Sequence, residues 1–210
     1  MIECGIDEAG RGPVIGPLVI CGVCGDSNLL KELGVKDSKK LSPKRREFLF
    51  GEILKIVKSY KCVEIWPEEI DSMREKMNIN EIEEKYFSEI INSLEGDIFI
   101  LDAADVSEER FEEMIRKNLN KDVKIISKHK ADRDYPIVSA ASIIAKVTRD
   151  REIEKIKKQI GDFGSGYPSD PRTIKFIRDY IEKNGKFPPF TRKSWKTIKN
   201  INRHIEEYGD

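Results

Sequence analysis

The chain has 210 residues, 39% of them hydrophobic and 36% charged, so it can bury a core of ordinary density and corresponds to one large domain or one domain with an appendage. Its 38 basic and 38 acidic residues cancel, so net charge alone points to neither a nucleic acid nor a membrane as partner. The apolar run VIGPLVICGV has roughly half the length of a membrane helix, and Asp7 and Glu8 interrupt the apolar segment before it. We therefore expect no membrane span, no signal peptide and a cytoplasmic protein.

The first part of the chain predicts two strands, a helix and a third strand. The stretches IECGID and PLVICGVC are short, apolar and joined by a glycine-rich turn around residues 10–16, so we expect an antiparallel hairpin. Pro43 begins a helical pattern that carries Leu49 and Ile53 on one side. The stretch YKCVEIW then alternates polar and apolar residues as a strand does.

The rest of the chain alternates strands with helices and ends in helices. A helical pattern over residues 79–94 leads to GDIFILDAAD, a buried strand that ends in acidic residues. Ser107 is the candidate N-cap of the next helix, which the strand DVKIIS follows. Pro136 begins a long helix that GDFGSGYPSDP breaks, and two shorter helices over 170–183 and 194–207 complete the chain. This order indicates an α/β domain with a mixed sheet and a helical C-terminal piece.

Four cysteines, Cys4, Cys21, Cys24 and Cys62, are too few and too irregularly spaced for a disulfide framework in a chain of this size. Their pattern favours a reducing compartment. The Cys21-Gly-Val-Cys24 spacing has the form of a redox or zinc pair, but it overlaps an apolar strand, in which residues three apart point to opposite faces. We therefore predict that the cysteines are core thiols.

Acidic residues occur where the pattern places strand ends or loops beside helix starts, which is where α/β folds gather ligands and catalytic groups. Taken singly, each acid is more typical of a cap or a turn. Carboxylates at several strand ends repel one another unless protons or cations neutralise them, and oxygen donors without His or Cys suit Mg²⁺ or Mn²⁺ rather than zinc. The pattern predicts metal-assisted phosphate chemistry. The residues are Asp7 with Glu8, Asp102, Asp105, and Asp132 with Asp134.

The charges are unevenly distributed along the chain. Seventeen acidic and four basic residues lie between Glu64 and Glu113, whereas basic residues gather in KDSKKLSPKRR and again from Arg172 to Lys199. Each basic stretch alone could be a solvated helix face. Two basic regions flanking an acidic middle suit a polyanion held against an acidic, metal-binding centre.

Several motifs together carry a resemblance to a known family. In chain order they are GIDEAGRGPVIGPLV, DSKKLSP, LDAAD, KADRDYPIVSAASIIAKVTRD, FGSGYPSDP and RKSWKT, which span residues 5–197. The chain closely resembles ribonuclease HII, in particular the archaeal type. The related ribonuclease HIII has a large N-terminal extension and a different residue at the arginine of the first motif, so the Gly-Arg-Gly sequence here favours HII.

The resemblance implies a ribonuclease H-like fold, with a mixed five-stranded sheet flanked by helices in a catalytic domain over 1–160 and a helical substrate-binding domain over 161–210. It implies an endonuclease that cuts the RNA strand of RNA/DNA hybrids and incises DNA duplexes on the 5′ side of a single embedded ribonucleotide, as in ribonucleotide excision repair. It also implies a monomer. A sliding clamp is a conceivable partner, but the terminal IEEYGD shows no clear clamp-binding pattern.

By resemblance, the catalytic and metal-binding carboxylates are Asp7, Glu8, Asp102 and Asp132, and Asp105 and Asp134 are nearby decoys. Two divalent ions, Mg²⁺ or Mn²⁺, would activate a water, so the products would carry a 5′-phosphate and a 3′-hydroxyl. Neighbouring residues of a perfect strand alternate faces. We therefore expect the chain to bend at Asp7 and Glu8 so that both reach one site.

The resemblance also implies a substrate-binding set. Gly10, Arg11 and Gly12 correspond to the element that senses the ribose 2′-hydroxyl, and glycines allow bare backbone to approach a sugar closely. Tyr167 matches a tyrosine that packs on the adjoining deoxyribose, although a tyrosine between glycine and proline could simply cover a turn. Lys39 is a plausible phosphate contact in a basic loop before a helix.

Two other classes of protein compete with this interpretation. The carboxylates alone would permit another metal-dependent phosphoesterase, such as a phosphatase, but such an enzyme would not need two basic regions, and no usual phosphate-binding glycine loop is present. A non-catalytic nucleic-acid-binding module would leave the acidic strand ends unexplained, because they repel a phosphate backbone.

Overall fold

The computed structural model describes residues 1–35 and 40–208. The chain forms two compact units. The first, here called the sheet unit, comprises Met1–Ala9, Val19–Glu64 and Asn78–Thr148. The second, here called the helical unit, comprises Gly10–Leu18, Ile65–Met77 and Arg149–Asp210. Among the described residues, the helices are all too short or too polar to cross a bilayer.

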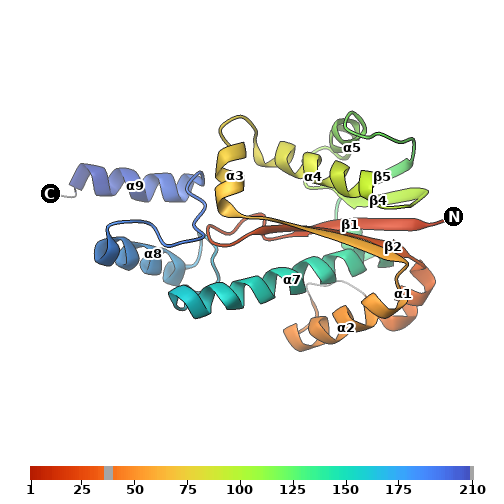
Figure 1. The fold of residues 1–210 in the computed structure, drawn as a ribbon, viewed down its shortest axis with the longest axis horizontal. Coiled ribbons are helices and arrows are strands. Elements are labelled where there is room, and N and C mark those ends of the chain that lie inside the picture. Colours follow the sequence, from red (N-terminus) through yellow and green to blue (C-terminus); the bar gives the residue numbers. More distant parts are fainter. Residues whose placement is uncertain (36–39, 209–210) are drawn as a thin grey trace. The chain divides into compact units, whose positions relative to one another are not determined.

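A five-stranded mixed sheet forms the centre of the sheet unit, in the order β3-β2-β1-β4-β5 (Figure 1). Strand β1 pairs antiparallel with β2 and parallel with β4, and β4 pairs parallel with β5. The predicted hairpin and mixed sheet are confirmed. The strands are β1 (Glu3–Ala9), β2 (Leu18–Gly25), β3 (Ser59–Ile65), β4 (Ile98–Asp102) and β5 (Lys124–Lys128).

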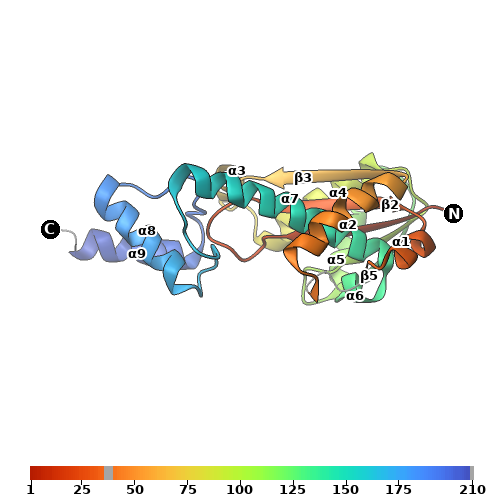
Figure 2. The same cartoon turned by 90° about the horizontal axis from the view of Figure 1, so that it is seen from below.

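Helices cover both faces of this sheet (Figures 1 and 2). Helices α4 and α5 pack on one face, and α2 with the first part of α7 packs on the other. Three short helices were not foreseen from the sequence, α1, α3 and α6. The helices assigned to the chain are α1 (Ser27–Leu33), α2 (Pro43–Ile56), α3 (Pro67–Met73), α4 (Ile79–Ser93), α5 (Glu108–Arg116), α6 (Ala131–Asp134), α7 (Pro136–Ile160), α8 (Pro171–Asn184) and α9 (Lys196–Tyr208).

Helix α7 packs directly against the backbone of β1 at Gly5. A Cβ atom at this position would lie only 2.5 Å from the carbonyl carbon of Ile137, so only glycine allows this approach. On the other face, a Cβ at Gly22 of β2 would lie 2.4 Å from the side chain of Ile90 in α4. Because side chains alternate along a strand, Asp7 leaves β1 on the same face as Gly5, toward α7.

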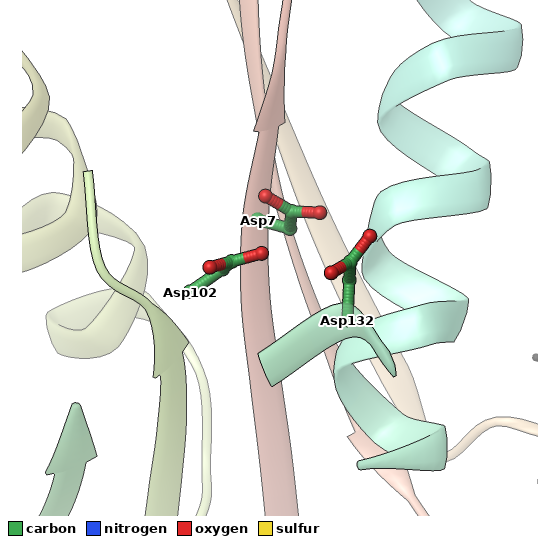
Figure 3. Close-up of side chains that lie close together, drawn as sticks. All are labelled: Asp7, Asp102 and Asp132. Atoms are coloured by element: carbon green, nitrogen blue, oxygen red, sulfur yellow. The ribbon is translucent and has the colours of Figure 1, made fainter. Parts of the chain in front are cut away.

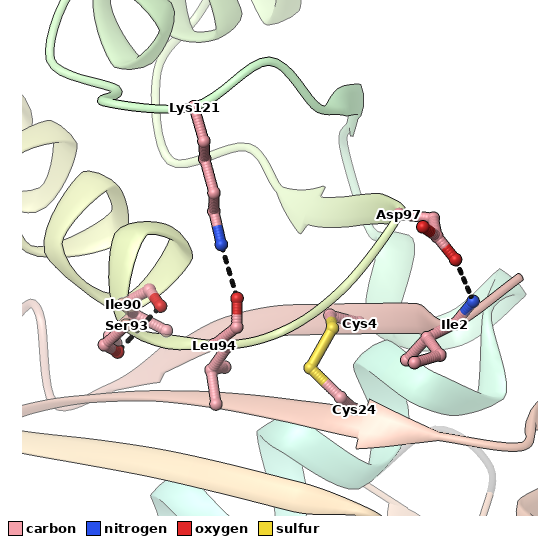
Figure 4. The surroundings of a disulfide bond; sticks show 8 residues. All are labelled: Ile2, Cys4, Cys24, Ile90, Ser93, Leu94, Asp97 and Lys121. Atoms are coloured by element: carbon pink, nitrogen blue, oxygen red, sulfur yellow. Dashed lines mark hydrogen bonds between the residues drawn. A yellow bond between two sulfur atoms is a disulfide. The ribbon is translucent and has the colours of Figure 1, made fainter.

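The cysteines form two disulfides, Cys4–Cys24 and Cys21–Cys62, so the prediction of free core thiols is wrong. Cys4 lies directly opposite Cys24 in the antiparallel pair of β1 and β2, with the Cα atoms 4.0 Å apart (Figure 4). Cys21 pairs instead with a cysteine of the edge strand β3. The expectation that Cys21 and Cys24 point to opposite faces agrees with these separate partners. Which cysteines meet depends on strand register, and their spacing in sequence does not reveal it.

The helical unit has an apolar core of its own. Residues of the loop after β1, of the end of α7 and of α8 and α9 form it. Asp170 caps the start of α8 with a side chain that accepts a hydrogen bond from the Arg172 amide, and Gly185, in the left-handed conformation, caps its end. The buried core residues are Val14, Ile15, Ile156, Phe163, Ile177, Ile198 and Ile201.

The two disulfides should stabilise the sheet unit strongly, because they close loops with sequence separations of 20 and 41 residues. Each should contribute about 3–4 kcal/mol on the loop-closure scale. In a chain of this size about 1 kcal/mol corresponds to a change of about 2–4 °C in Tm, so we expect a reducing agent to lower the Tm by roughly 10–30 °C, measured by circular dichroism. A variant with all four cysteines replaced by alanine should not respond to the reducing agent. An unreduced wild-type protein that titrates with four free thiols would contradict the assignment.

Candidate active site

Three aspartates from three different elements converge at one edge of the sheet unit. One carboxylate oxygen from each of Asp7, Asp102 and Asp132 lies within 4.8 Å of the others (Figure 3). Asp7 belongs to β1, Asp102 is the last residue of β4, and Asp132 lies in the short helix α6. Asp7 and Asp132 are buried, whereas Asp102 is half-buried. Oxygen donors this close together can hold a hard divalent cation.

Parallel pairing of β1 with β4 brings the first two aspartates together. Ile6 pairs with Leu101, so the next residue of each strand is an aspartate. The carboxyl ends of neighbouring parallel strands lie at the same edge of a sheet, and this is where α/β folds gather ligands. The predicted meeting of strand-end acids is therefore confirmed for Asp7 and Asp102.

Asp132 reaches the same place through a tight turn after β5. Lys130 adopts a left-handed conformation with φ 57°, which redirects the chain into the four-residue helix α6. The Ser139 hydroxyl of α7 donates a hydrogen bond to the Asp132 carbonyl, and the Tyr135 amide donates to Ala131 at 2.9 Å. Both contacts are made to backbone carbonyl groups, and they fix the segment that carries the buried Asp132 side chain.

Strand β1 does not bend at Asp7 and Glu8, contrary to expectation. Its antiparallel register with β2 continues unbroken to Ala9, and the chain turns only at Gly10, with φ 84°. The two Cβ atoms therefore leave on opposite faces. A hydrogen bond nevertheless joins the Asp7 and Glu8 side chains, so the two carboxyl groups meet. Asp7 interacts with Ser142 and Lys146 of α7, whereas Glu8 interacts with Glu83 of α4. Glu8 is not among the three residues that converge within 4.8 Å, although its carboxyl group still interacts with those of Asp7 and Asp102.

Burial dominates the electrostatics of this cluster. Burial raises the pKa of Asp7 well above its ordinary value, and the nearby Glu8 carboxylate raises it further, while Ser142 and Lys146 lower it. Burial also raises the pKa of Glu8, as do the carboxylates of Glu83 and Asp102. Desolvated carboxylates that face one another favour protonation or a bound cation. The site is therefore chemically suited to divalent metal.

Asp105 and Asp134, which the resemblance leaves outside the catalytic set, lie in different environments from the three converging aspartates. Asp105 is buried and forms an ion pair with Arg110, which also lies 3.4 Å from Glu84. Asp134 is exposed and pairs with Arg133 at 2.8 Å. Neither aspartate belongs to the converging group.

The helical unit holds most of the predicted substrate-binding residues. Gly12 is exposed, and a Cβ on it would lie 3.2 Å from the ring of Tyr167, so the glycine motif and the tyrosine are neighbours. Tyr167 is 45% exposed, which leaves its ring accessible to a ligand. Arg11 is half-buried. The remaining predicted contact, Lys39, lies outside the described residues.

Sequence reasoning missed the polar residues that surround the aspartates. On α7, Ser139, Ser142 and Lys146 share one face at intervals of three and four residues. The Lys146 ammonium group donates to the Ser142 hydroxyl at 2.8 Å. The first part of α7 is otherwise apolar, so polar residues spaced three and four positions apart in it could have identified this face from the sequence.

Comparison with known proteins agrees with this arrangement. The family model for ribonuclease HII matches residues 4–198. A ribonuclease HII from Thermococcus onnurineus is 54% identical over 206 residues, which cover 96% of this chain and 90% of the relative.

Solved structures agree as well. The ribonuclease H2 of Pyrococcus horikoshii superposes with a TM-score of 0.93 at 46% identity and covers 99% of this chain and 100% of its own. A ribonuclease HII from Archaeoglobus fulgidus, solved in complex with PCNA, gives a TM-score of 0.87 at 46% identity, covering 93% and 96%. The matches extend over both units described above. The chain belongs to the ribonuclease HII family and is a type 2 ribonuclease H.

Proposed function

We propose that this enzyme hydrolyses the RNA strand of RNA/DNA hybrids and incises DNA duplexes on the 5′ side of single embedded ribonucleotides. The convergence of Asp7, Asp102 and Asp132 within 4.8 Å is the observation that carries the proposal. Such a cluster of hard oxygen donors suits metal-assisted hydrolysis of a phosphodiester. The products would carry a 5′-phosphate and a 3′-hydroxyl, because a water attacks rather than the ribose 2′-hydroxyl.

The three aspartates would hold Mg²⁺ or Mn²⁺, with a contribution from the carboxyl group of Glu8, which is hydrogen-bonded to Asp7 and interacts with Asp102. The donor set fits these ions because it consists of carboxylate oxygens, and because burial makes the negative charge of Asp7 and Glu8 costly without a cation. Two divalent ions about 3.5–4 Å apart, when bound, would activate a water and stabilise the leaving oxygen. Lys146, close to Asp7, would offset part of the negative charge in the metal-free site.

The Gly10–Gly12 segment and Tyr167 would determine which phosphodiester bond of the substrate is cleaved. Backbone at Gly10, Arg11 and Gly12 would contact the ribose 2′-hydroxyl, which both donates and accepts hydrogen bonds. The half-exposed ring of Tyr167 beside Gly12 would pack on the neighbouring sugar. Lys39 would contact a phosphate.

We further propose that residues 1–160 act as the catalytic domain and 161–210 as the substrate-binding domain of a cytoplasmic monomer that acts in ribonucleotide excision repair. Basic residues between Arg172 and Lys199 would attract the phosphate backbone. The relative from Archaeoglobus fulgidus was solved with PCNA, so a sliding clamp is the protein partner to test first.

The decisive experiment offers a DNA duplex with one ribonucleotide, an RNA/DNA hybrid and an all-DNA duplex, each with Mg²⁺ or Mn²⁺. We expect incision of the first two substrates and none of the third, with a 5′-phosphate and a 3′-hydroxyl identified by ligation and end-labelling. A chelator should abolish the reaction. A cyclic phosphate end would disprove the mechanism, and hydrolysis of small phosphate esters without incision would favour another phosphoesterase.

Replacing Asp102 and Asp105 separately by asparagine tests the ligand assignment. Asp102→Asn should lower kcat by about 100-fold or more, because it removes a charged oxygen from the converging group. Asp105→Asn removes only the ion pair with Arg110, so turnover should stay close to wild type while the Tm falls. Steady-state kinetics and thermal unfolding, measured side by side, separate the two effects. Equal turnover in both variants would refute the assignment.

The raised pKa of Asp7 predicts that its charge destabilises the metal-free protein at neutral pH. A carboxyl group with a raised pKa binds more protons in the folded than in the unfolded state. Stability therefore falls as pH rises from the ordinary value of 3.8 through the raised one. Asp7→Asn should remove this loss and raise the metal-free Tm by several degrees at pH 7. Each tenfold difference in proton affinity between the folded and unfolded states corresponds to about 1.4 kcal/mol in the free energy of unfolding.

The matched control is Asp134→Asn, which removes an exposed carboxylate. It should change the metal-free Tm little. Added Mg²⁺ should stabilise the wild type and the control more than Asp7→Asn. A lower Tm for Asp7→Asn in chelator would show that the charge of Asp7 is not a cost to the fold.

A further inference from the structure

Arg192 of the helical unit is fully buried and holds the glycine-rich loop, residues 10–17, from the inside. Its Nη2 donates to the Gly10 carbonyl at 2.6 Å, its Nη1 to the Arg11 carbonyl at 2.9 Å, and its Nε to the Gly16 carbonyl at 3.0 Å. One guanidinium group thus joins the beginning of the loop to its end. Only arginine offers several N–H donors in one rigid plane.

Other side chains of the same unit hold three more carbonyls of the loop. The Trp195 indole donates to Gly12 at 3.2 Å. Arg149, also buried, donates to Pro17 at 2.5 Å and to Ile15 at 3.3 Å. The loop's carbonyl groups therefore face an anchor of two buried arginines and one tryptophan.

The glycines alone do not hold this loop in one shape. Gly10 and Gly16 have φ values of 84° and 89°, a conformation that glycine permits but does not enforce. Arg192 contacts the carbonyls of both glycines, and its own amide donates to the Val14 carbonyl at 2.8 Å. The buried arginine therefore restricts the freedom that the glycines introduce.

This anchor also determines where the loop's amides point. In a trans peptide, the carbonyl of one residue and the N–H of the next point in opposite directions, and the described residues contain no cis peptide bond. Because Arg192 holds the carbonyls of Gly10 and Arg11, the amides of Arg11 and Gly12 point away from it. Gly12 is exposed, next to Tyr167.

We propose that Arg192 is a specificity-determining positioning residue, which sets the discrimination between ribose and deoxyribose by holding the Arg11 and Gly12 amides in place. Arg192 itself, being fully buried, acts through the loop. The inference rests on the proposed function of the Gly10–Gly12 segment as the 2′-hydroxyl sensor. A backbone misplaced by about 1 Å can cost on the order of 100-fold in rate.

Arg192→Lys tests the proposal, because it keeps the charge while a single nitrogen cannot reach three carbonyls. The readout is the ratio of kcat/KM for a duplex with one ribonucleotide to kcat/KM for an RNA/DNA hybrid. A single ribonucleotide offers the loop one 2′-hydroxyl, whereas a hybrid offers one at every position. We expect the ratio to fall about tenfold or more.

Two further variants make the result interpretable. Ile177→Val shortens a side chain in the core of the same unit and removes none of the hydrogen bonds to the loop's carbonyl groups, so it should lower the Tm and leave the ratio unchanged. Trp195→Phe keeps a ring but removes the donor to Gly12, so it should lower the ratio even where Arg192→Lys does not fold.

An unchanged ratio in Trp195→Phe and in a folded Arg192→Lys variant, with an active wild type, would overturn the proposal. A ratio that falls equally in Ile177→Val would also overturn it, since general loss of stability would then explain the effect. A wild type that cuts neither substrate would refute the proposed function, and this inference with it.

Discussion

Mutual repulsion among buried carboxylates is the constraint on which the site depends. Parallel pairing of β1 with β4 places Asp7 and Asp102 side by side, and the left-handed turn at Lys130 brings Asp132 to them. Like charges repel at this separation, and for Asp7 both burial and the neighbouring Glu8 carboxylate raise the pKa and so oppose ionisation. The surrounding fold must therefore supply the free energy that keeps them together until a cation does.

The sheet unit is built to resist that repulsion. Helix α7 lies so close to β1 that only glycine fits at Gly5, two residues before Asp7. The Cys4–Cys24 disulfide links β1 covalently to β2, one residue before Gly5. Close packing and a covalent bond at the same strand restrict the relaxation that would separate the carboxylates. Rigidity in the sheet thus preserves the closeness of carboxylates that repel one another in the absence of a cation, as the proposed metal site requires.

The ends of the strands could be predicted from the sequence, because an apolar run followed by an acidic residue, as in IFILD, is a local pattern. Other features of the fold have no such local pattern. Seven-residue helices such as α1 and α3 are too short to show a full amphipathic period. Strand alternation led us to expect a bend at Asp7 and Glu8, but β1 is unbroken there and a side-chain hydrogen bond joins the two residues. Disulfide pairing and the contacts of Arg192 depend on residues brought together by the fold, the latter across 182 positions to Gly10.

The two tasks that we propose for this enzyme, hydrolysis and recognition of a ribose hydroxyl, are assigned to neighbouring parts of one short segment. Asp7 and Glu8 close strand β1 of the sheet unit, and Gly10 opens the loop that Arg192 holds in the helical unit. Hydrolysis needs charged oxygens fixed by a rigid sheet, whereas recognition of a hydroxyl needs bare backbone that a sugar can approach. A strand can supply the first and a glycine loop the second. Each loses its geometry without support from distant residues, which is why α7 and Arg192 belong to the functional machinery as much as the motif itself.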